Sequence, residues 1–194
     1  MRLVLLGPPG AGKGTQSEAI ASTFSIPHIS TGDIFRANVR GETPLGKEAS
    51  GYMSRGGLVP DDVVNRMVAD RLRQADAEAG FLLDGYPRTV GQAYTLGGML
   101  AMMDESLDLV LHFLVAEEEL AARIAKRQAE ENRDDDAAAV FERRMTEYRA
   151  QTTDLIPHYR DIGLLVDVDA VGTVDEVRQR VLSACREAVD GGSS

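Results

Sequence analysis

The sequence predicts an α/β fold in which five parallel strands form a central sheet and helices cover both of its faces, giving three layers. Short apolar runs alternate with helical patterns along most of the chain, which is typical of proteins whose helices connect parallel strands. The length of 194 residues suits one such core with small inserted lobes. A hydrophobic content of 43% is enough to fill that core.

Each expected strand is a short apolar run, and the first is followed by a glycine-rich turn and a helical pattern over Lys13–Phe24. The longest run comes in the second half of the chain. The five expected strands are Arg2–Leu6, Pro27–Ser30, Phe81–Leu83, Leu107–Val115 and Leu164–Val168.

Two stretches do not fit this alternation. Residues 31–70 hold helical pieces interrupted by Gly41, Pro44 and Pro60, with no obvious strand, which indicates a small helical lobe. Residues 126–136 have almost no apolar content and lie between two helical patterns. We expect a solvated loop or lid there.

The composition excludes several classes of protein. A net charge of −10 argues against a general binder of nucleic acids or membrane surfaces, because these need a broad positive face. No apolar run approaches the roughly 20 residues of a membrane span, and the first apolar stretch is too short for a signal peptide, so we expect a cytoplasmic protein. The single cysteine, Cys185, cannot form an internal disulfide, and no cysteine cluster is present to bind zinc.

The clearest motif is the glycine-rich loop between the first strand and the first helix. The segment Gly7–Thr15 (GPPGAGKGT) matches the G-x-x-x-x-G-K pattern of a P-loop, in the strand–loop–helix context that the pattern requires. Its backbone N–H groups and the helix N-terminus attract phosphate oxygens, and Lys13 can reach the β- and γ-phosphates. Gly14 follows Lys13, so the usual magnesium-binding hydroxyl comes one residue later, at Thr15. We therefore expect Mg²⁺ to be held mostly by phosphate oxygens and water.

A second motif follows the third expected strand. Asp84 ends the apolar run, Gly85 and Pro87 predict a tight turn, and Arg88 follows them. A carboxylate at the end of a strand beside the P-loop strand is the usual partner of Mg²⁺-bound water in P-loop enzymes. We therefore predict that Asp84 acts on Mg²⁺ through water, with Asp33 as a weaker second candidate.

Four motifs in order make the chain similar to the adenylate kinases. They are GPPGAGKGT, STGDIFR at residues 30–36, GGLVPD at residues 56–61, and LDGYPRT at residues 83–89 followed by Gln92. The resemblance implies the reaction ATP + AMP ⇌ 2 ADP, a role in adenine nucleotide homeostasis, and a monomer. It also implies a P-loop core over residues 1–29, 60–125 and 137–194, an AMP-binding lobe over residues 30–59, and a mobile lid over residues 126–136.

The resemblance assigns residues to the two nucleotides. On the ATP side it implies the loop residues Gly10, Ala11, Gly12, Lys13, Gly14 and Thr15, with Arg123, Arg127 and the turn at Gly172. On the AMP side it implies Thr31, Arg36, Gly57, Leu58, Val59, Gly85, Tyr86, Pro87, Arg88 and Gln92, with Arg133 and Arg144. Gln92 resembles the residue that reads the adenine edge, since its amide offers one donor and one acceptor to N1 and N6.

The arginines around the expected lid resemble those that close over the transferring phosphoryl group. Preplaced guanidinium groups stabilise the charge of that transition state, so Lys13, Arg88, Arg133 and Arg144 are the expected catalytic residues. Lys126 is an alternative to Arg127, and Arg143 is expected in solvent because it points about 100° from Arg144 on a helix. The expected lid lacks the long, often zinc-binding insertion of some family members, so the chain resembles the short-lid bacterial type.

Two other functions stay open at this point. A kinase for UMP, CMP or GMP would have the same fold, although Thr31 and Gln92 favour AMP. A nucleotide-binding protein without catalysis is the other alternative, and it predicts ATP binding without ADP formation when AMP is added. The three histidines, His28, His112 and His158, have no partner pattern in the sequence and are expected to be structural.

Overall fold

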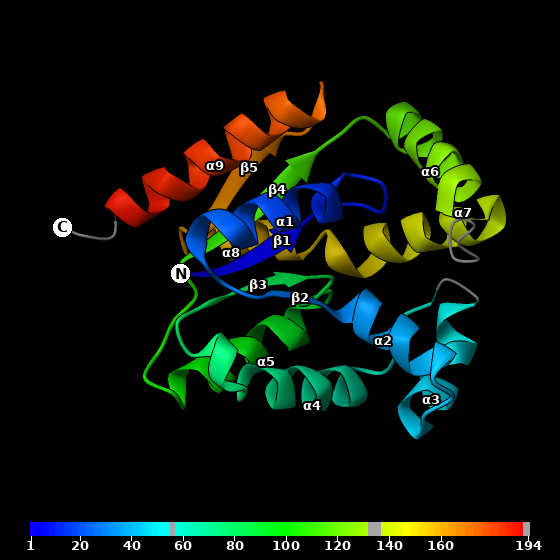
Figure 1. Ribbon diagram of the computed structural model, residues 1–194, viewed down its shortest axis with the longest axis horizontal. Helices are drawn as coiled ribbons and strands as arrows, with labels where there is room; N and C mark the ends of the chain where they lie inside the picture. The colour runs from blue at the N-terminus through cyan, green and yellow to red at the C-terminus, as the bar shows by residue number, and fades with distance from the viewer. Residues whose placement is uncertain (55–56, 132–136, 192–194) are drawn as a thin grey trace.

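A computed structural model describes residues 1–54, 57–131 and 137–191 of the chain. Its centre is a five-stranded, fully parallel sheet with the strand order β2-β3-β1-β4-β5 (Figure 1). The strands are β1 (Arg2–Leu6), β2 (His28–Ser30), β3 (Phe81–Asp84), β4 (Leu109–Leu114) and β5 (Leu165–Asp169). All five predicted strands are confirmed, with ends that shift by at most two residues.

The sheet is apolar on both faces, and β1 shows why. Side chains alternate along a strand, so Val4 and Leu6 join the hydrophobic cluster on one face while Leu3 and Leu5 join the cluster on the other. All four are at most 2% exposed. A strand that is buried on both sides reads as a continuous apolar run, which is the pattern its sequence shows.

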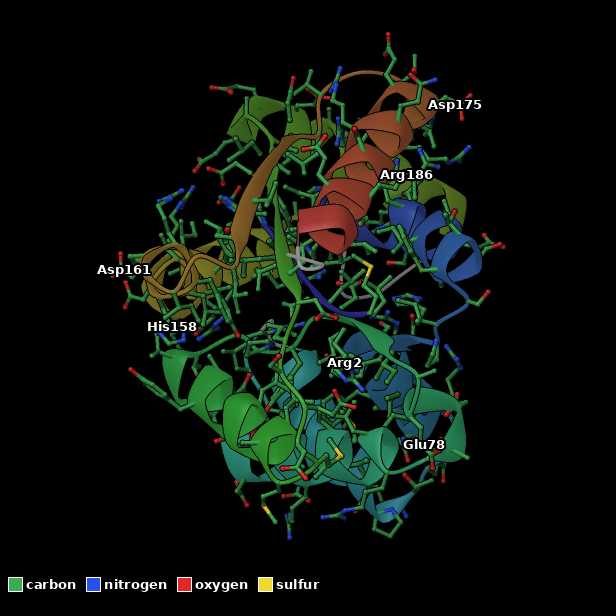
Figure 2. All side chains as sticks on the ribbon, turned by 90° about the vertical axis from the view of Figure 1, so that its left-hand side faces the viewer. Arg2, Glu78, His158, Asp161, Asp175 and Arg186 are labelled. Atoms are coloured by element: carbon green, nitrogen blue, oxygen red, sulfur yellow. The ribbon has the colours of Figure 1, made fainter. Side chains whose placement is uncertain are left out.

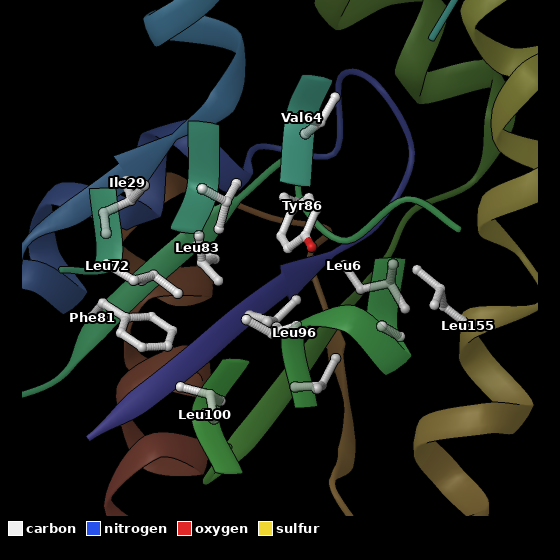
Figure 3. Packing of buried hydrophobic residues seen from close by; sticks show 14 of the residues in the cluster. Leu6, Ile29, Val64, Leu72, Phe81, Leu83, Tyr86, Leu96, Leu100 and Leu155 are labelled. Carbon is white, nitrogen blue, oxygen red and sulfur yellow. The ribbon is translucent and has the colours of Figure 1, made fainter. Parts of the chain in front are cut away.

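Helices cover each face (Figure 1). One face carries α4 (Asp61–Leu72), α5 (Val90–Ala101) and α8 (Leu155–Asp161), whose packing against the strands is seen closely in Figure 3. The other face carries α1 (Lys13–Phe24) and α9 (Val174–Gly191), which also pack against each other. The predicted three-layer fold is therefore confirmed.

The stretch predicted as a small helical lobe begins with a pair of helices, α2 (Thr31–Arg40) and α3 (Pro44–Met53), that pack against each other. Side-chain caps begin both helices: the Ser30 hydroxyl accepts from the Asp33 N–H at 3.2 Å, and the Thr43 hydroxyl accepts from the Gly46 N–H at 3.0 Å. These local signals explain why the stretch breaks into short helices instead of joining the sheet.

The prediction of a loop from Lys126 onward is wrong for its first half. Helix α6 runs over Glu117–Glu131, and the next described helices are α7 (Ala138–Glu147) and the short π-helical η3 (Tyr148–Thr152). Lysine, arginine, glutamine, alanine and glutamate all favour helix, so a stretch without apolar residues can still continue one in solvent. Residues 132–136, including Arg133, lie outside the described residues.

The two ends of the sheet have different surroundings. At the amino end, Arg2 donates to the Glu78 carbonyl at 3.1 Å and pairs with Glu105 at 2.5 Å, which ties β1 to the neighbouring loops (Figure 2). At the carboxyl end, the register sets Leu5 of β1 opposite Asp84 of β3, so the loop after β1 and the turn after β3 start side by side. Among the described helices, none is both long and apolar enough to span a membrane.

Candidate active site

The glycine-rich loop curls over the start of α1. Gly10 and Gly12 have φ angles of 85° and 88°, a left-handed backbone that favours glycine, and Gly12 is the residue that caps α1. The Lys13 ammonium folds back on this loop and donates to the carbonyl oxygens of Gly7 at 2.7 Å and Pro8 at 3.0 Å. The loop is therefore curled tightly at its glycines, and its lysine is held against its own carbonyl groups.

A large cavity of about 1140 Å³ opens beside this loop at the carboxyl end of the sheet. Its walls bring together residues from the loop, from the β3 turn and from helices α6 and α7. Among the predicted site residues, the walls include Gly10, Ala11, Gly12, Lys13, Gly14, Thr15, Asp84, Gly85, Pro87, Arg88, Arg127 and Arg144.

A smaller pocket of about 70 Å³ adjoins the large cavity. The two share walls, including Arg36, Gly85, Arg88 and Arg144. The predicted AMP-side residues that line it are Thr31, Arg36, Gly57, Leu58, Val59, Gly85, Arg88, Gln92 and Arg144. Sequence reasoning thus grouped residues that are up to 113 positions apart, from Thr31 to Arg144, around a common pocket.

Positive charge converges on the loop. Burial lowers the pKa of Lys13 to about 8; the charge of Asp84 opposes this effect, and the charges of Arg88, Arg144 and Arg127 add to it. These guanidinium groups come from three different elements, so the fold has assembled a cationic cluster inside a protein of net charge −10. Such a cluster suits a ligand that carries several phosphates.

The only carboxylate of the β3 turn stays ionised among these cations. Burial raises the pKa of Asp84, but the nearby His28 ring and the charges of Lys13 and Arg88 outweigh it and hold the pKa below its usual value. The His28 Nε2 atom lies 3.8 Å from Asp84 Oδ2, and His28 also lines the large cavity. His28 was predicted to be structural, so its place at the site was missed; its position on the strand beside β3 is the only signal in the sequence.

Gln92 lies in a hydrogen-bond network that ties α5 to α4. Its Nε2 donates to Asp61 Oδ1 at 2.7 Å, and its Oε1 accepts from the Arg88 N–H at 2.7 Å. The other Asp61 oxygen accepts from the Thr89 hydroxyl at 2.9 Å. Gln92 is 2% exposed, and Asp61, at the start of α4, was not singled out from the sequence.

Three predicted residues in the described part of the chain, Tyr86, Arg123 and Gly172, do not line either cavity. The Tyr86 side chain is 0% exposed in the core, where its hydroxyl donates to Asn65 Oδ1 at 2.7 Å. Arg123 pairs with Glu119 and donates to the Ala170 carbonyl at 2.9 Å. That contact holds the turn of Gly172, whose φ of 122° also favours glycine.

Side-chain exposure distinguishes the alternative cationic residues in and after the expected lid. Arg127 is half-buried and lines the large cavity, whereas the neighbouring Lys126 is exposed. Arg144 lines both cavities, whereas Arg143 is exposed, as predicted from the helical angle between them. These observations favour Arg127 and Arg144 as the residues that face a bound nucleotide.

The donors at the site fit a magnesium ion that arrives with a nucleotide. In the part of the chain that the structure describes, no three carboxylate, histidine or cysteine side chains gather as a metal cage. Asp84 lines the cavity as an ionised carboxylate. One carboxylate together with phosphate oxygens and water is a common way for proteins to bind Mg²⁺.

Comparison with known proteins agrees with this geometry. The family model described as adenylate kinase matches residues 5–164. The chain is 54% identical to the adenylate kinase of Thermobifida fusca over 186 residues, which cover 96% of this chain and 98% of the relative. It is 53% identical to the adenylate kinase of Nocardia farcinica over 184 residues, which cover 95% and 98%.

The chain belongs to the adenylate kinase family. It is therefore a phosphotransferase of the P-loop class, and the fold and enzyme class expected from the four motifs are confirmed. As an adenylate kinase it has a donor and an acceptor nucleotide to accommodate, and the two adjoining cavities offer room for both.

Proposed function

We propose that the chain transfers the γ-phosphoryl group of ATP to AMP, giving two ADP, in the large cavity and the pocket that adjoins it. The observation that carries this proposal is the convergence of Lys13, Arg88, Arg127 and Arg144 with one ionised carboxylate, Asp84, on a shared wall. Two phosphate-bearing substrates that bind side by side need such a cluster, whereas a single nucleoside monophosphate does not.

On the donor side, the loop from Gly10 to Thr15 is proposed to cradle the ATP phosphates. Its backbone N–H groups and the N-terminus of α1 supply positive potential without reorganisation. Lys13 would leave the carbonyls of Gly7 and Pro8 for the phosphate oxygens, and Arg127 would face them from α6. Arg123 and the turn at Gly172 are proposed to bound the base of ATP.

On the acceptor side, the pocket between α2 and the β3 turn is proposed to take AMP. Arg36 and Arg88 would hold its phosphate, and Gln92 would meet its base between the backbone of Gly57 and Val59. The AMP oxygen that attacks is ionised at neutral pH, so this transfer needs no general base. The protein must position two anions and exclude water.

Arg144 lines both cavities and is proposed, with Arg133, to stabilise the charge that spreads over the transferring group. Asp84 would hold Mg²⁺ through water, and the ion would neutralise phosphate charge when it binds with ATP. We further propose that residues 30–59 and 126–136 close over the substrates and that the enzyme works as a monomer in the cytoplasm. A buried cysteine thiol suits that reducing compartment.

The replacement Lys13→Met tests the reaction. It should reduce ADP formation from ATP and AMP by at least about a hundredfold, because it removes a charge from the transition state, with circular dichroism unchanged. Lys47→Met is the matched control, since Lys47 is exposed on α3, away from both cavities.

The same assay run with CMP, UMP and GMP as acceptors distinguishes the alternatives. A clear preference for AMP supports the proposal. A higher rate with another monophosphate would identify that monophosphate as the acceptor instead of AMP. ATP binding with no ADP formed from any acceptor would mean that the protein does not catalyse the transfer.

A further inference from the structure

We propose that Asp61 determines the preference of the acceptor pocket for a 6-aminopurine over a 6-oxopurine, by holding the Gln92 amide in one orientation. The proposal rests on the function proposed above, in which Gln92 meets the base of the monophosphate. Asp61 would act as a positioning residue, because it contacts Gln92 and is not one of the residues that line the pocket.

The orientation of the amide follows from what each neighbour can do. A carboxylate only accepts hydrogen bonds, so Asp61 Oδ1 at 2.7 Å requires the nitrogen end of the Gln92 amide. A backbone N–H only donates, so Arg88 N at 2.7 Å requires the oxygen end. Rotating the amide by 180° would set donor against donor at one end and acceptor against acceptor at the other.

Burial makes this orientation costly to reverse. Gln92 is 2% exposed, so water cannot readily replace a lost partner, and an unpaired buried polar group is expensive. The Asp61 carboxylate is itself held in place, because its second oxygen accepts from the Thr89 hydroxyl at 2.9 Å. The Thr89 hydroxyl also accepts from the backbone N–H of Gln92 at 3.1 Å, so the hydrogen bonds lead from Gln92 through Asp61 and Thr89 back to Gln92.

The orientation has a consequence for base recognition. An amide nitrogen carries two hydrogens and an amide oxygen has two lone pairs, so each atom of Gln92 keeps one further bond for a ligand. Adenine presents a donor at its 6-amino group and an acceptor at N1, whereas a 6-oxopurine presents an acceptor at position 6 and a donor at N1–H. A reversed amide would therefore suit the 6-oxopurine, and the fixed amide suits adenine.

The test compares AMP with inosine monophosphate, which differs from AMP at position 6 and in the proton on N1. Asp61→Leu keeps about the size of the side chain and removes both accepting oxygens, whereas an asparagine could still accept from Gln92 and donate to the Thr89 hydroxyl. The ratio of kcat/KM for AMP to kcat/KM for inosine monophosphate should fall about tenfold, since one of the two bonds that orient the amide is lost. The KM for ATP should stay unchanged.

The matched control is Asp62→Leu, the same change one residue further along α4. The Asp62 side chain is 75% exposed and pairs only loosely with Arg66, at 3.6 Å, so its variant should keep the wild-type ratio. Thr89→Val is a second variant, which frees one oxygen of Asp61 and should lower the ratio in the same direction.

The ratio separates positioning from a purely structural role, because loss of folded protein lowers both rates equally and cancels. An unchanged ratio in Asp61→Leu, with wild type active on AMP, would overturn the inference and leave the proposed function intact. A wild type that does not phosphorylate AMP would overturn the proposed function itself.

Discussion

At the residue scale, the protonation of Lys13 depends both on its burial and on whether a nucleotide is bound. Burial lowers its pKa to about 8, so in the free protein its proton is held less firmly than in an exposed lysine. Phosphate oxygens beside the ammonium would favour the charged form and raise this pKa again. Nucleotide binding and protonation of Lys13 are therefore linked.

This linkage predicts how ATP affinity changes with pH. Above about pH 8 the free protein loses the Lys13 proton while the complex keeps it, so binding takes up a proton and weakens as the pH rises, by up to about tenfold per pH unit. Calorimetric titration with ATP between about pH 7 and 9.5 measures this slope. In Lys13→Met the affinity should be lower and nearly independent of pH over the same range, and an equal slope in both proteins would contradict the role of Lys13.

Sequence reasoning was strongest at residues that lie in local motifs. The P-loop and the β3 turn could be predicted because binding phosphate together with Mg²⁺ requires glycines, a lysine and an acid at fixed spacings. The roles of His28 and Asp61 were missed, because each acts through a contact with another side chain, Asp84 and Gln92 respectively, and no local pattern in the sequence indicates such a contact. Tyr86 lies within a motif, yet its side chain packs in the core (Figure 3).

At the scale of elements, the crossing of α2 and α3 depends on one glycine. A methyl group on Gly46 would lie 2.1 Å from the Asn38 carbonyl oxygen and 2.6 Å from the Val39 nitrogen, both backbone atoms of α2 that cannot turn aside. The two helices can therefore approach this closely only with glycine at this position. Helix α2 carries Thr31 and Arg36, so the positions of these two residues in the wall of the acceptor pocket depend on this packing.

We expect Gly46→Ala to lower the free energy of unfolding by about 1–3 kcal/mol through overpacking and to raise the KM for AMP more than the KM for ATP. Thermal unfolding and initial rates measure the two effects. Gly97→Ala on α5 is the control, because the added methyl group has no heavy atom within 4 Å apart from its neighbours in the chain and the nearby backbone of its own helix. That variant should be neutral or more stable by about 0.5–1 kcal/mol, and a similar gain in Gly46→Ala would refute the packing argument.

Strands were easier to predict than the lid. A strand buried on both faces has a continuous apolar run and short length, and these properties are visible without a structure. The sequence at the end of α6 has almost no apolar residues, so periodicity gives no signal and only helix propensity remains. For this reason six residues of the expected loop, 126–131, belong instead to α6.

At the scale of the whole molecule, the arginines divide by location. Some line the cavities, whereas others pair with acids at the surface, such as Arg149 with Glu117 at 2.6 Å and Arg178 with Asp175 at 2.7 Å. Exposed pairs contribute little to stability. Within a chain of net charge −10, the cations of the large cavity cluster around Lys13, whose pKa is lowered by the charges of Arg88, Arg144 and Arg127.

The adjoining cavities predict an unequal thermal response to ligands. A dinucleotide that joins two adenosines through a polyphosphate should engage both cavities and raise the melting temperature more than saturating ATP or AMP alone. At equal ligand concentration, each tenfold gain in affinity adds about 1.4 kcal/mol, or roughly 3–6 °C for a chain of this size. Scanning fluorimetry measures the shift, and Arg88→Ala, which alters a wall common to both cavities, should reduce it. Equal shifts for the three ligands would mean that only one cavity binds.

The strand order also constrains how the chain reaches this fold during synthesis. β1 leaves the ribosome first, yet it lies at the middle of the sheet and needs β3 on one edge and β4 on the other. Until residues 109–114 have emerged, one edge of this very apolar strand has no native neighbour, and an unpaired apolar edge invites association between chains. The nascent protein is thus most exposed to aggregation while its first half is complete and its fourth strand is not.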